Sequence, residues 1–122
     1  MNLNPEQARK KLVEALRSGD YEQGKARLKS GNKFCCLGVA CDLYAKHERP
    51  ESGWHLEDDI GWTFLGLHDL LPKEVMIWLG FATSNGMGKS KSSLSLDYLN
   101  DRGRSFEYIS DVIENEEVKL IG

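Results

Sequence analysis

The sequence has few cysteines, few prolines, no long apolar run and no strong excess of either charge. A membrane-spanning helix needs about 20 consecutive apolar residues, and no stretch of this chain approaches that length. The three cysteines are an odd number and two of them are adjacent, which is not typical of a disulfide framework. Residues 1–5 lack the charged and apolar regions of a signal peptide. We therefore expect a cytoplasmic protein with reduced thiols.

The distribution of charge narrows the classes of partner. The net charge of the 122 residues is −3, which argues against a dedicated nucleic-acid-binding protein. Residues 1–47 carry nine Lys and Arg against five Asp and Glu, whereas residues 48–88 carry two against seven. A basic excess of this kind attracts anionic ligands, although it is also typical of a solvated surface. We expect no membrane partner, and a nucleic acid is disfavoured because the acidic middle interrupts any extended basic face.

The hydrophobic periodicity predicts an α+β fold: a compact, mostly helical single domain, residues 1–122, with a small β-hairpin. Asn4 and Gln7 form a capping box before an apolar stripe, and Gly19 ends this first helix. The helical period disappears from Tyr21 to Phe34. Residues 21–23 and 25–29 are expected to be extended, residues 30–32 to form a turn, and residues 33–35 to return as the second arm of a small hairpin. The remaining expected elements are helices from about Cys36 to Lys46, from Pro72 to Leu79, after a cap at Ser92 or Ser93 and after a cap at Ser105, and a strand at 118–121.

The most apolar segment runs from Phe34 to Tyr44 and contains all three cysteines. Its Cys, Gly and Ala stand where bulkier side chains are expected, so the segment is predicted to be buried against a closely approaching element. Gly38 weakens a helix by roughly 0.5–1 kcal/mol relative to Ala, a cost that a neighbouring backbone or a ligand in contact with it would explain. We expect Cys35, Cys36 and Cys41 to be inert core side chains.

Three sequence patterns are compatible with a catalytic or ligand-binding role, and all three stay open as alternatives. The segment Gly86–Ser90 resembles the end of a phosphate-binding loop, but Thr83 stands where the motif needs Gly. This segment has two other interpretations. It is a flap that contacts phosphate through Lys89, or it is a plain linker. Cys35 or Cys36 at a helix start would have a lowered pKa and serve as a nucleophile, although no spacing ties either to a histidine. Zinc is the weakest interpretation, because no CxxC pair occurs.

Aromatic rings outside the helical stripes are candidates for stacking on a ligand. Residues 47–71 have no clear period, and their rings are expected on short strands or on an aromatic-lined loop. Nucleic-acid bases stack on such rings for about 1–3 kcal/mol each, and polar groups near the ends of elements are typical binding residues. The candidate ligand contacts are Tyr21, Gln23, Arg27, Trp54, Trp62, Lys89, Asn100 and Arg102.

Several motifs cover most of the chain, and they are Leu16–Gly24, Phe34–Leu43, Leu71–Val75, Trp78–Gly80, Leu99–Phe106, Ile109 and Ile113. Together these motifs resemble a widespread family of small, uncharacterised proteins of tailed phages and prophages. The resemblance implies the cytoplasm of an infected bacterium as the setting. Residues 47–70 match no motif of that family. Small phage accessory proteins are often counter-defence factors, and some bind nucleotide immune signals such as cyclic ADP-ribose or cyclic dinucleotides.

The residues and the resemblance together predict a binding protein without catalysis. It would sequester a small anionic ligand, a nucleotide-derived immune signal, as a homo-oligomer and without a cofactor or metal. The expected roles are base stacking by Tyr21, Trp54 or Trp62, phosphate binding by Arg27, Lys89 and Arg102, and hydrogen bonds to ribose or base edges from Gln23 and Asn100. Two alternatives remain, which are a protein-binding inhibitor of a host defence enzyme and a cysteine-dependent enzyme.

Overall fold

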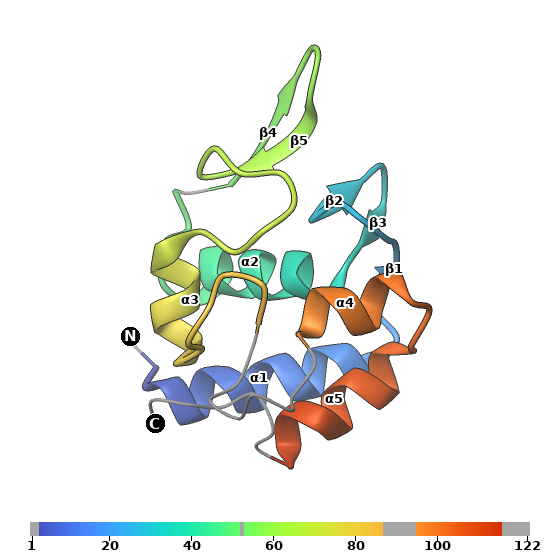
Figure 1. Ribbon diagram of the computed structural model, residues 1–122. Coiled ribbons are helices and arrows are strands. Elements are labelled where there is room, and N and C mark those ends of the chain that lie inside the picture. Colours follow the sequence, from blue (N-terminus) through green and yellow to red (C-terminus); the bar gives the residue numbers. More distant parts are fainter. Residues whose placement is uncertain (1–2, 52, 87–94, 116–122) are drawn as a thin grey trace.

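The computed structural model describes residues 3–51, 53–86 and 95–115, whose arrangement is shown in Figure 1. Within these residues the chain forms five helices and two small sheets, which confirms the predicted α+β class. The helices are α1 (Pro5–Ser18), α2 (Cys36–His47), α3 (Lys73–Leu79), α4 (Leu96–Asp101) and α5 (Phe106–Glu114). The strands are β1 (Glu22–Gln23), β2 (Lys29–Ser30), β3 (Lys33–Phe34), β4 (Trp54–Glu57) and β5 (Gly61–Phe64).

Helix α1 begins and ends where the sequence predicts. The Asn4 side chain accepts the backbone N–H of Gln7 at 2.8 Å, and the Gln7 side chain accepts the backbone N–H of Asn4 at 3.0 Å. Gly19 follows the helix in the left-handed conformation, with φ of 82°. The apolar stripe of α1 packs against α5, α2 and α3. None of the helices in the described ranges has the length and apolar character needed to cross a membrane.

Helix α2 lies at the centre of the molecule, between α1 and the two sheets (Figure 1). A Cβ atom built on Gly38 would lie 1.8 Å from the carbonyl oxygen of Leu28. The same carbonyl accepts the backbone N–H of Cys35 at 3.2 Å, which holds the two segments together. Only glycine permits this approach, so the expected contact between Gly38 and a neighbouring backbone is confirmed.

In the three-stranded sheet, β3 lies between β1 and β2, parallel to the first and antiparallel to the second. The predicted hairpin is confirmed as β2–β3. Residues 25–28 were expected to be extended, and this expectation is wrong because they form bends. Ala26 takes a left-handed conformation with φ of 68°, and its N–H donates to Asp101 Oδ1 at 2.8 Å. A contact distant in sequence therefore decides the local conformation.

Strands β4 and β5 form a second, antiparallel hairpin that projects away from the helices (Figure 1). Trp54 lies opposite Phe64, and Leu56 lies opposite Trp62. These four side chains share one face of the hairpin, because side chains two residues apart in a strand point to the same side. At the base of the hairpin the Trp54 ring lies 5.1 Å from the ring of the buried Phe64 and 5.8 Å from the ring of Phe34. The hairpin is therefore anchored to the core through its base.

Helices α4 and α5 begin at serine caps. The Ser105 hydroxyl accepts the backbone N–H of Tyr108 at 3.0 Å, as predicted for α5. The cap of α4 is Ser95, whose hydroxyl accepts the N–H of Tyr98 at 3.4 Å. This helix therefore begins later than the sequence analysis placed it. The serines at 92 and 93 and the strand expected at 118–121 lie outside the described residues.

Candidate functional site

The three cysteines are buried in the core. Burial raises the pKa of Cys35 to about 11 and the pKa values of Cys36 and Cys41 well above their usual range, because an apolar surrounding disfavours the thiolate. Cys36 Sγ donates to the carbonyl oxygen of Leu96 at 3.5 Å. A buried, protonated thiol is a weak nucleophile, so this geometry disfavours the cysteine-enzyme alternative.

Two of the expected ligand contacts, Gln23 and Asn100, lie together. Gln23 Nε2 donates to Asn100 Oδ1 at 2.9 Å and to the carbonyl oxygen of Arg104 at 2.7 Å. Asn100 Oδ1 also accepts the backbone N–H of Cys36 at 3.2 Å, and Asn100 Nδ2 donates to the carbonyl oxygen of Gly24 at 2.7 Å. Asn100 is fully buried. Its amide joins β1, the start of α2 and α4, which is a structural role.

The basic residues expected to meet phosphate make separate contacts. Arg27 donates through Nη1 to the carbonyl oxygen of Ile60 at the β4–β5 turn. The guanidinium of Arg102 lies 5.4 Å from the centre of the Tyr98 ring, at the end of α4. Lys89 lies outside the described residues, so its role and the phosphate flap stay predictions.

Tyr21 and Trp54, two of the expected stacking rings, meet at the carboxylate of Asp42 on α2. Tyr21 donates its hydroxyl to Asp42 Oδ2 at 2.5 Å, Trp54 Nε1 donates to Oδ1 at 3.2 Å, and Lys46 Nζ lies 3.2 Å from Oδ2. Burial opposes the ionisation of Asp42, but these three donors outweigh it and lower the pKa of that carboxyl. Burial, with the bond to Asp42, raises the pKa of Tyr21 to about 12. The cluster fastens the base of the β4–β5 hairpin to α2.

Trp62, the third expected stacking ring, contacts a cation of the chain itself. Lys29 Nζ lies 4.2 Å from the centre of the Trp62 ring, 5.3 Å from that of Phe34 and 5.6 Å from that of Trp54. An ammonium over an aromatic face is stabilised by about 0.5–2 kcal/mol. Lys29 therefore links β2 to the hairpin and lies over a ring face that a stacked base would use.

An open groove of about 440 Å³ lies between the end of α1 and the start of α5. It is lined in part by Tyr21 and Gln23, so two of the expected ligand contacts share it. Arg17 and Glu107 line the same groove and give it both signs of charge. A charge balance of this kind does not select strongly for an anion.

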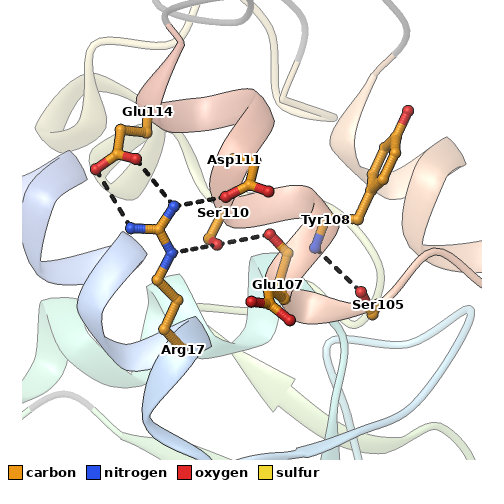
Figure 2. A network of polar contacts seen from close by, with 7 residues as sticks. All are labelled: Arg17, Ser105, Glu107, Tyr108, Ser110, Asp111 and Glu114. Carbon is orange, nitrogen blue, oxygen red and sulfur yellow. Dashed lines mark hydrogen bonds and ion pairs between the residues drawn. The ribbon is translucent and has the colours of Figure 1, made fainter.

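Arg17 is the polar centre of the contact between α1 and α5 (Figure 2). Its Nε donates to Ser110 Oγ at 2.9 Å, and its Nη2 donates to Asp111 Oδ1 at 2.6 Å and to Glu114 Oε1 at 2.9 Å. In the sequence Arg17 belongs to the basic excess of residues 1–47 and to the motif Leu16–Gly24, and neither pattern predicts its partners. Its three partners follow more than ninety positions later in the chain, and no local spacing signals such a contact.

We call residues 54–67 the arm, because they comprise the β4–β5 hairpin and the turn that follows it. Seven large apolar side chains are exposed in the described part of the chain, and four of them lie on the arm. They are Leu56, Ile60, Leu65 and Leu67, with exposed fractions of 65%, 41%, 43% and 37%. Sequence reasoning missed these residues. The sequence does not show that the hairpin projects, and this projection leaves Leu56 exposed on the face that it shares with the buried Phe64.

Leu65 has an unusual backbone conformation as well as an exposed side chain. Phe64 and Leu67 exchange two backbone hydrogen bonds, at 2.8 and 3.1 Å, which closes a two-residue turn. Both central residues are left-handed, with φ of 50° at Leu65 and 90° at Gly66. Glycine, asparagine and aspartate suit such a turn, whereas leucine in this conformation costs about 1–2 kcal/mol. Strain at an exposed apolar residue suggests a functional reason for that residue.

The arm is also acidic. Residues 50–72 contain five carboxylates and no Lys or Arg. Glu57, Asp58 and Asp59 lie at the β4–β5 turn. No group of three or more His, Cys, Asp or Glu side chains within the described ranges is placed to hold a metal ion. Negative charge therefore lies beside the exposed apolar side chains of the arm, while Arg27 and Lys29 approach the arm from outside it.

Comparison with family models places the chain in an uncharacterised family. The chain belongs to the family described as Domain of unknown function (DUF8296), whose model matches residues 4–117. No curated protein and no solved structure matches the chain. The match extends over both the helices and the arm, and it assigns no activity to either.

Proposed function

We propose that this protein acts by binding a partner protein through the arm, without catalysis of its own. The observation that carries the proposal is the exposure of four large apolar side chains within residues 54–67. Exposed apolar residues gathered on one projecting element favour a partner that covers them. The carboxylates of the β4–β5 turn favour a partner with basic side chains beside its apolar contact area.

The polar residues of the motifs that carry the resemblance to phage proteins support the proposal indirectly, because their polar groups already bond within the protein. Gln23 and Asn100 bond to each other and to backbone groups, and Arg17 bonds to α5. Ser105 caps a helix. These internal bonds explain the residues without a ligand, whereas residues 47–70, which match none of the motifs, include the arm.

The setting implied by the resemblance favours a bacterial host protein as the partner. A phage accessory protein that covers a functional surface of a host defence enzyme inhibits it by occupancy alone. Such an inhibitor needs no catalytic residues and no cofactor. The role we propose is therefore that of an inhibitor of a basic host protein in an infected cell.

Two matched substitutions test the proposal. Leu56→Glu places a charge on the arm, and Ile77→Glu places the same charge on α3, where Ile77 is 56% exposed. A host protein that co-purifies with the chain is purified separately and its dissociation constant is measured with each variant. We expect Leu56→Glu to weaken binding by about tenfold or more, and Ile77→Glu to bind as the unaltered chain does. Equal binding by both variants would contradict the proposal.

A second candidate is the sequestration of a small anionic ligand, a nucleotide-derived immune signal, by a homo-oligomer. The observation that favours it is the groove shared by Tyr21 and Gln23. Thermal-shift measurements with cyclic nucleotides and ADP-ribose derivatives test it directly. A melting temperature that rises with one of these ligands supports the candidate, and a melting temperature that rises with none of them at millimolar concentration removes it.

A further inference from the structure

The outer edge of β4 is open. Within the described residues β4 pairs only with β5, and the two strands form a sheet of their own. Phe64 exchanges both of its backbone hydrogen bonds with Leu67, so its N–H and C=O point away from β4. Because backbone direction alternates along an antiparallel pair, the N–H and C=O groups of Trp54 and Leu56 point outward from β4. These are the groups that a further strand would meet.

The residues on the two faces of the hairpin indicate which types of side chain an added strand would carry. One face carries Trp54, Leu56, Trp62 and Phe64, and Leu56 remains largely exposed on it. Glu57 lies at the tip of the other face, beside the carboxylates of the turn. A strand added along β4 continues both faces, because its side chains alternate in the same way. It would therefore place apolar side chains beside Leu56 and basic side chains beside Glu57.

A second copy of the chain is a less suitable occupant of this edge. A second copy would bring a second set of the same carboxylates, and residues 50–72 supply no Lys or Arg to pair with those of the first copy. The arm of a second copy therefore offers no charge complementarity to Glu57. A different protein with basic side chains at this edge does offer it.

We propose that β4 binds an extended segment of the partner protein as a third strand, and that this segment alternates apolar with basic residues. This inference rests on the proposed function and specifies its mode of recognition. Main-chain hydrogen bonds to Trp54 and Leu56 supply affinity, and the alternating side chains supply specificity.

The test uses a capped heptapeptide of alternating lysine and valine, labelled for fluorescence anisotropy. A second peptide has the same composition with the lysines and valines in separate blocks, and a third is the alternating peptide methylated at every backbone nitrogen. We expect only the first peptide to bind, because the second loses the alternation and the third loses its main-chain donors. Equal binding by all three peptides, or no binding by the first, would overturn the inference.

A proline substitution tests whether the backbone of β4 takes part in binding. The N–H of Leu56 points outward, so Leu56→Pro removes a donor from the open edge and leaves the bonds to β5 in place. Leu56→Val is the matched control, since it keeps both the donor and an apolar side chain. We expect about a tenfold or greater loss of peptide affinity for the proline variant and none for the valine variant. Amide NMR spectra check that both variants remain folded, and an unchanged affinity in a folded Leu56→Pro protein contradicts strand addition.

These outcomes are separable from those of the proposed function. If Leu56→Glu abolishes binding of the host protein while the alternating peptide fails to bind, the arm docks the partner and strand addition is wrong. If Leu56→Glu leaves binding of the host protein unchanged, the arm is not the docking surface and both proposals fail.

Discussion

The side-chain oxygen of Asn100 accepts the backbone N–H of Cys36 at 3.2 Å, so a residue of α4 caps the start of α2. The residue before α2, Cys35, makes no side-chain cap of its own. Asn100 lies 64 positions away along the chain and also bonds to Gln23 and to the carbonyl oxygen of Gly24. Asn100, a polar residue of the motif Leu99–Phe106, thus holds three segments of the core together.

The first prediction concerns this buried amide. Asn100→Ala leaves the N–H of Cys36 and the carbonyl oxygen of Gly24 without their partner, and we expect it to lower the free energy of unfolding by about 2–4 kcal/mol. Asn32→Ala in the exposed β2–β3 turn should change it by less than about 0.5 kcal/mol. Urea denaturation of both variants measures the difference. Similar midpoints would show that the Asn100 network is dispensable.

The second prediction concerns acid stability. The hydrogen bonds from Tyr21, Lys46 and Trp54 lower the pKa of Asp42 in spite of its burial. The carboxylate therefore contributes its full stabilisation above the unfolded pKa of 3.8, and this contribution is lost as the pH falls through the lowered pKa. Asp42→Asn should be less stable than the unaltered chain at neutral pH and should show a shallower loss of stability in acid. Parallel acid-induced losses in the two proteins would exclude a role for this carboxylate.

The third prediction concerns the link between the arm and the helices. Lys29→Met keeps the length of the side chain and removes the charge over Trp62, which we expect to destabilise the attachment of the arm by about 1 kcal/mol. Hydrogen exchange at the amides of His55 and Thr63 should become faster. Lys73→Met, at the start of α3, is the control and should leave these amides unchanged. Exchange that is the same in both variants would mean that Lys29 does not hold the arm.

The fourth prediction concerns thiol reactivity. Burial keeps Cys35, Cys36 and Cys41 protonated at neutral pH, so the native protein should react slowly with iodoacetamide at all three positions. Labelling of Cys35 should accelerate as the pH approaches about 11. The urea-unfolded protein should react at every thiol. Rapid labelling of one cysteine in the native protein at pH 7 would revive the enzyme interpretation.

Local signals could be read from the sequence, and contacts between distant segments could not. Asn4 and Gln7 lie three positions apart, so their capping box is visible in the sequence. The need for a close neighbour at Gly38 could also be inferred, although the identity of that neighbour, Leu28, could not. The contact of Arg17 with α5 depends on how the two helices pack, and the residues near Arg17 in the sequence do not predict it.

The site was harder to predict than the fold for a physical reason. Tyr21, Trp54 and Gln23 have the chemistry of ligand contacts, but the same hydrogen-bonding and stacking groups also assemble a core. Amino-acid composition does not distinguish an aromatic side chain that binds a ligand from one that packs against a neighbouring residue in the core. The exposure of Leu56 follows from the projection of β4 and β5, which no periodicity within residues 47–70 reveals.

The central claim is that the arm, and not the groove beside Tyr21, is the binding surface. The most direct test is to map amide chemical-shift changes when the purified host protein is titrated into the labelled chain. Our account predicts that the largest changes cluster within residues 54–67. Changes that centre on Tyr21 and Gln23 and leave the arm unaffected would contradict it.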